Sequence, residues 1–432
     1  MEFLVVGAGI GGLTAALKLH QLGLNVTVAE AATDMRPLGV GINLLPHGVA
    51  VLAELGLEDR LAATGIATRA IEYRTKYGQL ILSDPRGRDA GFPWPQYSIH
   101  RGHLQMMLLE AARERIGSER IKTGLEFQDF DREAHGIIAH FRRRPGGGVE
   151  SLRAGALIGA DGIRSRVCEV LVPAAPPLLF SGVMLYRGAV ERDPFLDGRT
   201  MIIAGHHDCK AVIYPVSQEA ATRGRSLVNW VAEIRVGKDK RYEREDWNRR
   251  ASAEEFADHY QDWTLGFIDV AALFRSTPQI YVFPMIDRDP LPHWSLGRVT
   301  LLGDAAHPMY PIGANGASQA ILDADVLAHV LADSHGNIED ALSAYEARRL
   351  APTAQVVLSN RAKGPERVLQ LAHERIRGPE DRIAEIITRE ELDAITQDYQ
   401  RVAGFDLETL RKRGANSKRF EFAAAKKLPG RE

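Results

Sequence analysis

Asp304 and His307 stand close together in the segment GDAAHPMYPIGANGASQAILDADVL, residues 303–327, and both could take part in acid–base chemistry or bind a metal ion. No second histidine or cysteine in this segment completes a set of metal ligands, so the sequence predicts no metal site. His307 stands beside a proline turn, where a histidine is expected to pack or to cap. The glycine-rich loop 311–316 leads into an apolar-periodic helix, whose N-terminal N–H groups would face a negatively charged ligand.

A second group of residues that could bind a ligand lies at the start of the chain. The apolar run EFLVV (2–6) precedes Gly7, Gly9, Gly11 and Gly12, and a helical pattern over 13–22 and the strand NVTVAE (25–30) follow. This order of strand, glycine turn, helix, strand and terminal acid predicts a dinucleotide-binding βαβ unit. The glycines permit the tight turn, the approach of a pyrophosphate and the close packing of helix on strand. The acid, Glu30, would accept hydrogen bonds from ribose hydroxyls, and Ile10 and Ala31 flank these positions.

Two further strand ends carry an aspartate and a glycine. ALIGADGIRSRV (156–167) is a predicted buried strand that ends in Asp161 and Gly162, and RVTLLGDAAH (298–307) is another that ends in Gly303 and Asp304. Each dipeptide alone is a common turn in which the aspartate caps a helix. The two segments indicate a function only when they are taken together with the glycine turn at 7–12, in this order along the chain.

The three segments together resemble the flavoprotein aromatic hydroxylases, which are single-component FAD monooxygenases of the salicylate and para-hydroxybenzoate hydroxylase type. The resemblance implies that Asp304 binds the ribityl chain or ribose of FAD, and that Asp161 and Gly162 lie near the pyrophosphate. It also implies a contact from Arg101, in SIHRGHLQ, to the flavin phosphates or ribityl chain, and a backbone contact from Leu125 to adenine. The remaining residues that we expect near FAD are Val40, Gly41, Gly303, Pro311, Gly313, Ala314 and Asn315.

The resemblance extends over most of residues 1–360. RPLGVGINLLP (36–46), PQYSIHRGHLQMMLL (95–109) and FPMIDRDPLPHW (283–294) are similar to the phenazine hydroxylases of the pyocyanin pathway. It implies an α/β fold: an FAD-binding, Rossmann-like domain of the glutathione-reductase type with an inserted antiparallel-sheet substrate domain and a C-terminal helical region. We expect the FAD-binding domain at 1–72, 98–172 and 296–360, the substrate domain at 73–97 and 173–295, and the helical region at 361–432. Residues 232–250 and the tail after about 362 diverge from the family.

The expected substrate domain contains alternating runs that predict an antiparallel sheet, among them VMLYRGAV, TMIIAG, AVIYPV and SLVNWVAEI. Such a sheet would supply a concave apolar wall for a planar ring. Arg187 interrupts an apolar run, so it should pair with a neighbouring acid, the flavin edge or a substrate carboxylate. The candidate catalytic residues are Tyr214 and Arg187. The candidate substrate contacts are Tyr186, Ile203, Tyr214 and Pro311. For each tyrosine and for Ile203, the alternative is packing in the core.

Composition narrows the class of protein. The chain has 432 residues, a formal net charge of −2, 45% hydrophobic and 25% charged residues, so neither a nucleic-acid partner nor a membrane surface is expected. No apolar run reaches membrane-spanning length. Cys168 and Cys209 form no CxxC pair, and a reducing cytoplasm is the expected location. Nothing in the sequence predicts an oligomeric state. The charged tail, residues 362–432, is expected to form a solvated helical cap or a packing surface.

The main functional hypothesis is an FAD-dependent monooxygenase that uses NADH or NADPH and O2 to hydroxylate an aromatic substrate. The resemblance implies a phenazine-like or aryl carboxylate, with or without decarboxylation, and oxygen transfer through a flavin C4a-hydroperoxide. The cofactor carries this chemistry, so no catalytic triad is expected. Two alternatives stay open: a flavin dehydrogenase or reductase without oxygen transfer, and a non-catalytic flavoprotein that acts as a sensor.

Overall fold

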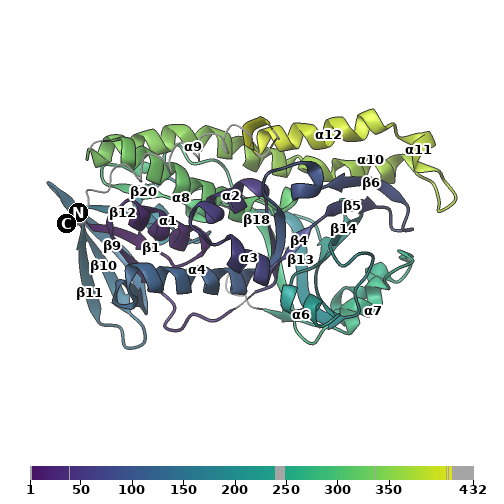
Figure 1. Cartoon of the computed structure of the whole chain (residues 1–432), viewed down its shortest axis with the longest axis horizontal. Helices are drawn as coiled ribbons and strands as arrows, with labels where there is room; N and C mark the ends of the chain where they lie inside the picture. The colour runs from purple at the N-terminus through teal and green to yellow at the C-terminus, as the bar shows by residue number, and fades with distance from the viewer. Residues whose placement is uncertain are drawn as a thin grey trace.

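The computed structural model describes residues 2–37, 39–238, 249–334, 336–404, 406 and 408–410. It contains a mainly parallel sheet with helices packed on it, a large mainly antiparallel sheet beside it, and a layer of helices that covers both (Figure 1). Hydrophobic side chains form one core around the parallel sheet and two further cores on the opposite faces of the large sheet. The predicted α/β architecture with an additional antiparallel sheet and a helical C-terminal region is confirmed.

The six-stranded sheet has the order β19-β20-β12-β1-β2-β8. Every neighbouring pair is parallel except β19 and β20. Its strands are β1 (Glu2–Val6), β2 (Asn25–Glu30), β8 (Ile121–Thr123), β12 (Ala156–Gly159), β19 (Ser295–Leu296) and β20 (Val299–Leu301). The three predicted strand ends therefore belong to adjacent parallel strands, and the carboxyl ends of β1, β12 and β20 meet at one edge of the sheet.

Helices cover the parallel sheet and continue across the molecule. Helix α1 contacts both α4 and α8, and α8 contacts α9. The longer helices are α1 (Ile10–Gln21), α2 (Pro46–Glu54), α3 (Glu58–Thr64), α4 (Arg101–Ile116), α8 (Gly316–Asp333), α9 (Ile338–Arg361), α10 (Arg367–Arg375) and α12 (Arg389–Val402). The short helices are α5 (Arg166–Leu171), α6 (Gln218–Thr222), α7 (Val270–Arg275) and α11 (Ile383–Ile386). No helix within the described part of the chain is both long and apolar enough to cross a membrane.

The eight-stranded sheet has the order β17-β18-β13-β16-β15-β14-β5-β6. Its strands are β5 (Ala70–Arg74), β6 (Leu80–Pro85), β13 (Leu178–Arg192), β14 (Thr200–Gly205), β15 (Cys209–Pro215), β16 (Ser226–Arg235), β17 (Arg250–Ala251) and β18 (Ile280–Arg288). The sheet is antiparallel except that β5 and β14 run parallel. This exception is allowed because the chain between these two strands is long enough for a crossover. The expected boundary at 72/73 falls inside β5.

Two small antiparallel sheets complete the fold. One has the order β3-β7-β4, with β3 (Gly41–Leu44), β4 (Ile66–Thr68) and β7 (Gln96–His100), and the expected boundary at 97/98 falls inside β7. The other has the order β11-β10-β9, with β9 (Leu125–Glu133), β10 (Gly136–Arg143) and β11 (Val149–Ala154). The glycines at 146–148 form the turn between β10 and β11, where the N–H of Arg143 donates to the carbonyl of Gly148 at 2.7 Å.

The C-terminal helices lie against the large sheet. Helix α10 contacts β5, β6 and β14, and side chains of α10 and α12 belong to the same hydrophobic core as one face of this sheet. Gln79, next to β6, donates its side-chain amide to the carbonyls of Gly378, Pro379 and Asp381. Figure 1 shows α10, α11 and α12 extending above β5, β6 and β14. Of the two alternatives for the tail, the packing surface is present in α10 and α12, and its partner is the large sheet. Residues 411–432 of the predicted tail lie outside the described residues.

Candidate active site

The glycine turn after β1 is tightly packed on one side and open on the other. Gly7 has a φ of 105°, and a Cβ on it would lie 2.4 Å from the carbonyl oxygen of Ala160. A Cβ on Gly12 would lie 2.0 Å from the carbonyl oxygen of Gly7, which explains why helix and strand approach so closely. A Cβ on Gly9 would meet nothing within 4 Å. The turn therefore leaves room for a ligand at Gly9, beside the start of α1 at Ile10.

Glu30, at the end of β2, is held by backbone N–H groups. Its Oε2 accepts from the N–H of Ala8 and its Oε1 from the N–H of Ala32, each at 2.8 Å. Both oxygens keep a lone pair for further donors. Glu30 lines a cavity of about 580 Å³ whose walls also contain Gly7, Gly9, Ala31, Leu125, Asp161 and Gly162.

Asp161 caps α5. Its Oδ1 accepts from the hydroxyl of Ser165 at 2.5 Å and its Oδ2 from the N–H of Val167 at 3.1 Å, and Ser165 itself accepts from the N–H of Cys168. Asp161 thus has the structural role that its dipeptide suggested, at the wall of the same cavity. The adjacent Gly162 has a φ of 81° and open space around its Cα hydrogens.

A second cavity, of about 330 Å³, adjoins the first. The two share Gly9, Arg101, Ala160 and Gly162 in their walls. Arg101 is the first residue of α4, and its N–H donates to the carbonyl of Val40 at 2.9 Å. Gly41 lines the second cavity and donates its N–H to Oδ1 of Asn229, in the large sheet, at 2.6 Å. The cavities therefore form one elongated space that begins at the parallel sheet and ends at the large sheet.

Asp304 opens into the second cavity. Its side chain is exposed and lines this space. Desolvation by the surrounding protein raises the pKa of the carboxyl. No hydrogen bond to its carboxylate comes from the described residues. The short helical turn Gly303–Ala305 places it directly after β20. A carboxylate in this position is available to accept hydrogen bonds from a ligand.

The loop before α8 forms another wall of the second cavity. Pro311, Gly313, Ala314, Asn315 and Gly316 line it. Gly313 and Ala314 both have a left-handed backbone, with φ of 66° and 55°. For alanine this conformation costs of the order of 1 kcal/mol, so the neighbouring structure must stabilise it.

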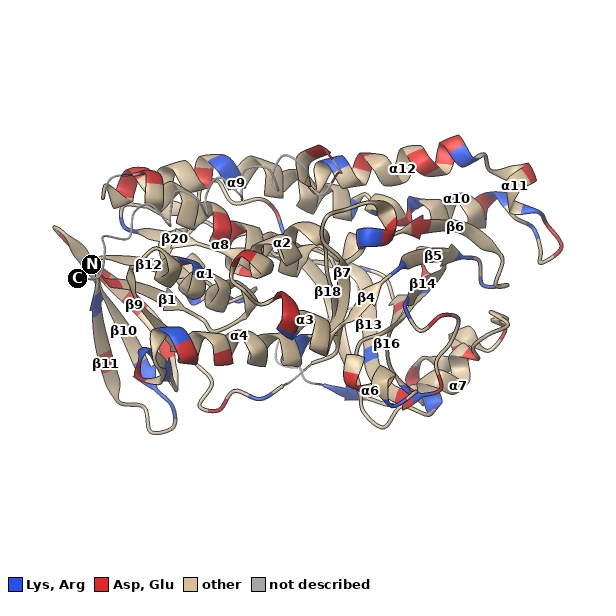
Figure 2. Ribbon diagram, viewed as in Figure 1, with Lys and Arg blue, Asp and Glu red and all other residues tan. Residues whose placement is uncertain are grey.

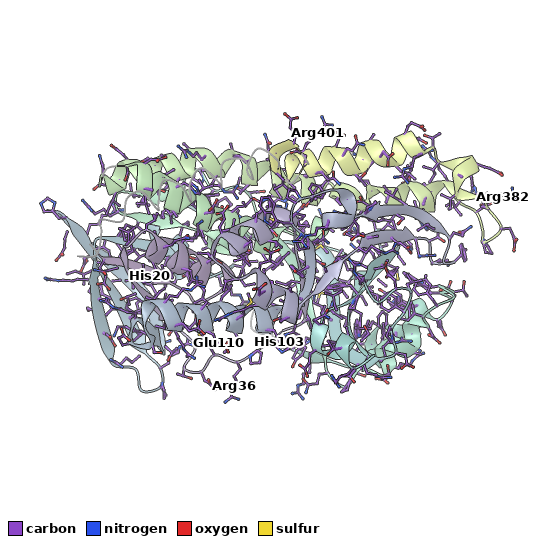
Figure 3. The ribbon with its side chains drawn as sticks, viewed as in Figure 1. His20, Arg36, His103, Glu110, Arg382 and Arg401 are labelled. Atoms are coloured by element: carbon purple, nitrogen blue, oxygen red, sulfur yellow. The ribbon has the colours of Figure 1, made fainter. Side chains whose placement is uncertain are left out.

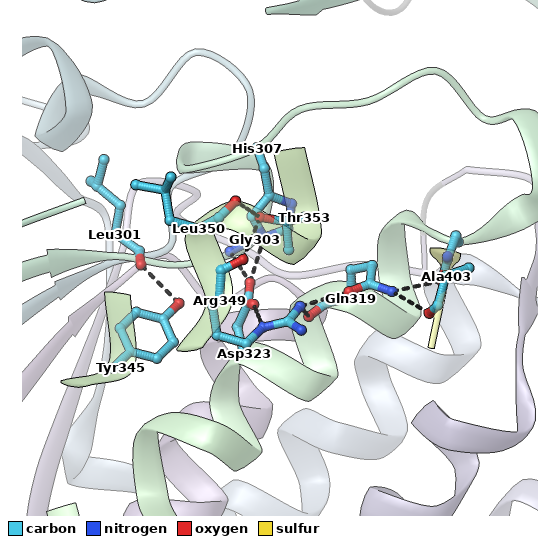
Figure 4. Close-up of polar contacts among 11 residues, drawn as sticks. Leu301, Gly303, His307, Gln319, Asp323, Tyr345, Arg349, Leu350, Thr353 and Ala403 are labelled. Atoms are coloured by element: carbon cyan, nitrogen blue, oxygen red, sulfur yellow. Dashed lines mark hydrogen bonds and ion pairs between the residues drawn. The ribbon is translucent and has the colours of Figure 1, made fainter. Parts of the chain in front are cut away.

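His307 belongs to a buried network behind this loop (Figure 4). Its Nε2 lies 2.5 Å from Oδ2 of Asp323, which also accepts from the N–H of Gly303 at 3.0 Å. Arg349, on α9, donates its Nε to Oδ1 of Asp323 at 2.6 Å and its Nη2 to the side-chain oxygen of Gln319 at 2.6 Å. His307 thus positions the turn that carries Asp304, in agreement with the packing role that the sequence predicted.

One face of the large sheet forms the apolar wall of the second cavity. Arg187 lies opposite Val231, Val231 opposite Val212, Val212 opposite Ile203, and Ile203 opposite Tyr73. Directly opposed residues point to the same face, so these five side chains form one row across five strands, and all five line the cavity. Tyr214, two positions after Val212, lies on the same face and lines it too.

Arg187 is the cation of this row. Its Nε is buried without a hydrogen-bond partner, and no acid among the described residues forms an ion pair with it. Burial lowers the pKa of the guanidinium, an effect that nearby Tyr214 and Glu233 partly oppose. Burial also raises the pKa of Tyr214 to about 12, so its phenol is neutral at physiological pH. A buried cation without an anionic partner is costly, and it is suited to receive an anionic ligand.

Tyr186 does not reach the cavity, which corrects its prediction as a substrate contact. Successive side chains of a strand point to opposite faces, so Tyr186 points away from the face that Arg187 occupies. It stacks on Phe256, with ring centroids 4.3 Å apart and an interplanar angle of 17°. The alternative considered for it, core packing, is the one that the structure shows.

Several cavity residues were missing from the sequence prediction. Lys210, only 3% exposed, lies between Glu233 at 2.9 Å and Glu366, and both carboxylates line the second cavity. Glu366 and Tyr399 come from the C-terminal region. The spacing of two in Met201–Ile203, Val212–Tyr214 and Val231–Glu233 is a usable signal for one sheet face. No local pattern indicates the two C-terminal residues.

The space and its polar groups fit a dinucleotide with a flat ring system. It passes the open side of Gly9 and presents carboxylates at Glu30 and Asp304 and the basic Arg101. The model of the FAD-binding domain family matches residues 1–360. The chain belongs to this FAD-binding family. The FAD-binding domain accounts for the parallel sheet and its three adjoining strand ends.

Individual relatives support this assignment. The chain is 48% identical to the phenazine 1,6-dicarboxylic acid hydroxylase PhzS of Lysobacter antibioticus over 83% of this chain and 89% of that protein. It is 30% identical to the 3-hydroxybenzoate 6-hydroxylase of Polaromonas naphthalenivorans, over 84% and 87% of the two chains. The fold matches a substrate complex of salicylate hydroxylase with a TM-score of 0.73, at 22% identity and over 95% and 97% of the two chains. The predicted family, FAD and an aromatic hydroxylase activity are confirmed.

Proposed function

We propose that this enzyme hydroxylates an aromatic carboxylate, with Arg187 as the residue that binds the carboxylate. The observation that carries this proposal is the half-buried guanidinium of Arg187 at the apolar wall of the second cavity, whose Nε is buried without a hydrogen-bond partner and which forms no ion pair with any described residue. The relatives act on a phenazine dicarboxylic acid and a hydroxybenzoate, which are aromatic acids. A phenazine-like carboxylate is therefore the preferred substrate class, and loss of the carboxylate as CO2 is an outcome that product analysis would reveal.

We infer that FAD occupies the two joined cavities. Gly7, Gly9 and the start of α1 would receive the pyrophosphate, Glu30 a ribose, and Asp304 the ribityl chain. Leu125 and Ala31 would border the adenosine part. When bound, FAD supplies the activation of O2 and the transfer of oxygen to the ring. The loop before α8 would face the flavin ring and stabilise negative charge on it with backbone N–H groups.

The large sheet would hold the substrate ring and keep water away from it. Ile203, Val212 and Val231 form a flat apolar surface beside Arg187. Removal of water strengthens the attraction between a carboxylate and the guanidinium. Tyr214 would contact the ring as a neutral phenol, and Pro311 would border it from the opposite wall.

NADH or NADPH is the proposed reductant. The described chain contains a single glycine turn of the dinucleotide type, so we propose that the nicotinamide coenzyme binds transiently and leaves before oxygen transfer. We retain the predicted division into three FAD-binding and two substrate segments, with all of β5 assigned to the substrate sheet. Both cysteines are free thiols, and a reducing cytoplasm stays the proposed location.

A substrate panel tests the proposal. Phenazine-1-carboxylate, phenazine-1,6-dicarboxylate, salicylate and 3-hydroxybenzoate are compared with unsubstituted phenazine, and both coenzyme oxidation and product mass are measured. We expect at least one acid to accelerate coenzyme oxidation and to give a product heavier by one oxygen, or by one oxygen less CO2. Equal rates with and without every acid would contradict the proposal, and faster oxidation that yields only H2O2 would exclude that acid as a substrate.

Asp304 is expected to contribute to retention of FAD. Substitution Asp304→Ala removes a charged acceptor, which corresponds to about 1.5–3 kcal/mol, or roughly 10- to 150-fold in FAD dissociation constant. The fold should persist, because Asp304 makes no hydrogen bond within the described chain. Fluorescence titration of the apoenzyme with FAD measures the effect, with the surface substitution Asp262→Ala as control. A dissociation constant equal to that of the control would remove Asp304 from the cofactor site.

A further inference from the structure

Helix α12 (Arg389–Val402) lies beyond residues 1–360, the part of the chain that matches the family model. Its outer face is charged, as Figure 2 shows, and Arg401 points away from the molecule (Figure 3), where it pairs with Asp398. Its inner face carries Tyr399, which is 3% exposed and lines the second cavity. One helix outside the matched region therefore reaches the active site.

Tyr399 contacts the loop before α8 with its hydroxyl group. The hydroxyl oxygen lies 3.2 Å from the carbonyl oxygen of Ile312 and 3.0 Å from Oδ1 of Asn360, at the end of α9. Burial raises the pKa of the phenol, so the hydroxyl keeps its proton and donates at physiological pH. Tyr399 also interacts with the side chain of Asn315, the residue directly before α8. The hydroxyl has one proton to share between two acceptors, and it connects α12 with the loop 311–316 and with the end of α9.

The ring of Tyr399 occupies the space beside Gly313. A Cβ on Gly313 would lie 2.1 Å from the Tyr399 hydroxyl oxygen and 2.3 Å from Cζ of its ring. A Cβ on Gly364 would lie 2.9 Å from the same ring. Glycine at 313 is therefore required twice, by its φ of 66° and by the approach of Tyr399.

The end of α12 adds a second connection to the same region. The carbonyl of Ala403 accepts from the side-chain amide of Gln319, on α8, at 3.0 Å. The other end of Gln319 accepts from Arg349, a member of the buried network in Figure 4. Tyr399, Ala403 and Leu410 form a small hydrophobic cluster with Leu45, which is held to α8 by a bond from its N–H to the hydroxyl of Ser318. The contact between α12 and the loop is therefore supported on both sides.

We propose that Tyr399 is a positioning residue for the flavin. It holds the loop 311–316 in its left-handed conformation through the Ile312 carbonyl and through contact with Gly313, and so fixes the backbone N–H groups that face the cavity. The left-handed backbone of Ala314, which is strained, is stabilised by this contact. The C-terminal region is thus a working part of the active site. This inference rests on family membership and on FAD binding, and it holds whichever aromatic acid is the substrate.

The conservative substitution Tyr399→Phe tests the hydroxyl. Loss of one hydrogen bond of about 1 kcal/mol corresponds to a roughly five-fold rise in FAD dissociation constant. We expect this rise together with a shifted visible absorption spectrum of the bound flavin. The control is Tyr281→Phe, which removes a hydroxyl that contacts Gln279 on the large sheet. A lower melting temperature with unchanged FAD affinity and flavin spectrum would show a structural role only and would overturn the proposal.

A double-mutant cycle tests the contact between ring and loop. Gly313→Ala should weaken FAD binding by about ten-fold or more, because the new methyl group meets Tyr399. Tyr399→Ala should also weaken it, since the loop loses its support. In the double variant the methyl group has room and only the cost of the left-handed φ remains, so Gly313→Ala should weaken FAD binding much less when added to Tyr399→Ala than it does in the wild type. If the changes in FAD binding free energy of the two single variants simply add in the double variant, the proposal is contradicted. Because FAD affinity and flavin absorption are read without substrate, failure here is distinguishable from failure of the proposed substrate class.

Discussion

Replacing Arg187 by methionine is expected to reduce kcat/KM for the carboxylate substrate by about 10²- to 10³-fold, because the substrate carboxylate would enter a buried apolar site without a partner. Methionine keeps most of the apolar volume of the side chain, so the wall formed by Val231 and Val212 should stay intact. The free enzyme should lose no stability. A buried guanidinium without an ion-pair partner is costly, and its replacement by an apolar side chain of similar length is neutral or stabilising.

A substrate analogue separates the carboxylate contact from a general loss of activity. The wild-type enzyme should strongly prefer the carboxylate to the carboxamide of the same ring, and Arg187→Met should lose most of this preference. Arg235→Met serves as the control, since Arg235 is at the outer end of β16 and pairs with Asp208 on the surface. If the variant retains the preference, another group binds the carboxylate, and the proposed function loses its main support.

The parts of the site that the sequence predicted are local. Both strands and the glycine turn of the first βαβ unit lie where the pattern placed them, because close packing at Gly7 and Gly12 and the buried apolar runs of β1 and β2 are properties of short segments. The same holds for the strand end at Asp304. These positions are determined by a strand and the turn that follows it, and both can be recognised without knowledge of the rest of the chain.

The face of the large sheet to which a side chain points could not be predicted from a short segment. Tyr186 and Arg187 are neighbours in a run where both faces of the strand are buried, so hydrophobicity does not distinguish the face toward the cavity. The register with Val231 and Tyr281 decides it, and register depends on strands far away in sequence. One of two adjacent candidates was therefore placed on the wrong face.

The cavity residues from the C-terminal region could not be predicted for a related reason. Glu366 and Tyr399 lie in a segment whose many charged residues suggested a solvated surface, and the outer face of α12 is indeed charged. The few inward side chains make the functional contacts, with Lys210 and with the loop at Ile312. The Lys210–Glu366 and Tyr399–Ile312 contacts join residues that are 156 and 87 positions apart in the sequence, and no periodic pattern in either segment indicates them.

Asp323→Asn is expected to cost about 3–5 kcal/mol in unfolding free energy, because it removes the anion that His307 and Arg349 share and leaves a buried guanidinium unpaired. The asparagine has almost the same shape, so the loss reports charge and not volume. The N–H of Gly303 also loses its ionic acceptor, so FAD affinity should fall together with stability. Urea denaturation of the apoenzyme measures the first effect. The control Asp193→Asn changes an aspartate that is 86% exposed.

The pH dependence of this loss distinguishes an ionised Asp323 from a neutral one. Burial by itself would raise the pKa of its carboxyl, but His307 and Arg349 outweigh burial and lower the pKa to about 2. A pKa below its ordinary value of 3.8 means that the folded state favours the ionised form. The stabilisation is therefore fully present above about pH 5 and disappears as the pH falls toward 2, by an amount on the order of 2 kcal/mol. The asparagine side chain of the variant does not titrate, so the difference in urea midpoint between wild type and Asp323→Asn should shrink steadily over this range, while the difference for Asp193→Asn should stay near zero. A difference that is constant from pH 5 to the acid limit of folding would mean that His307 and Arg349 do not depend on a charged Asp323.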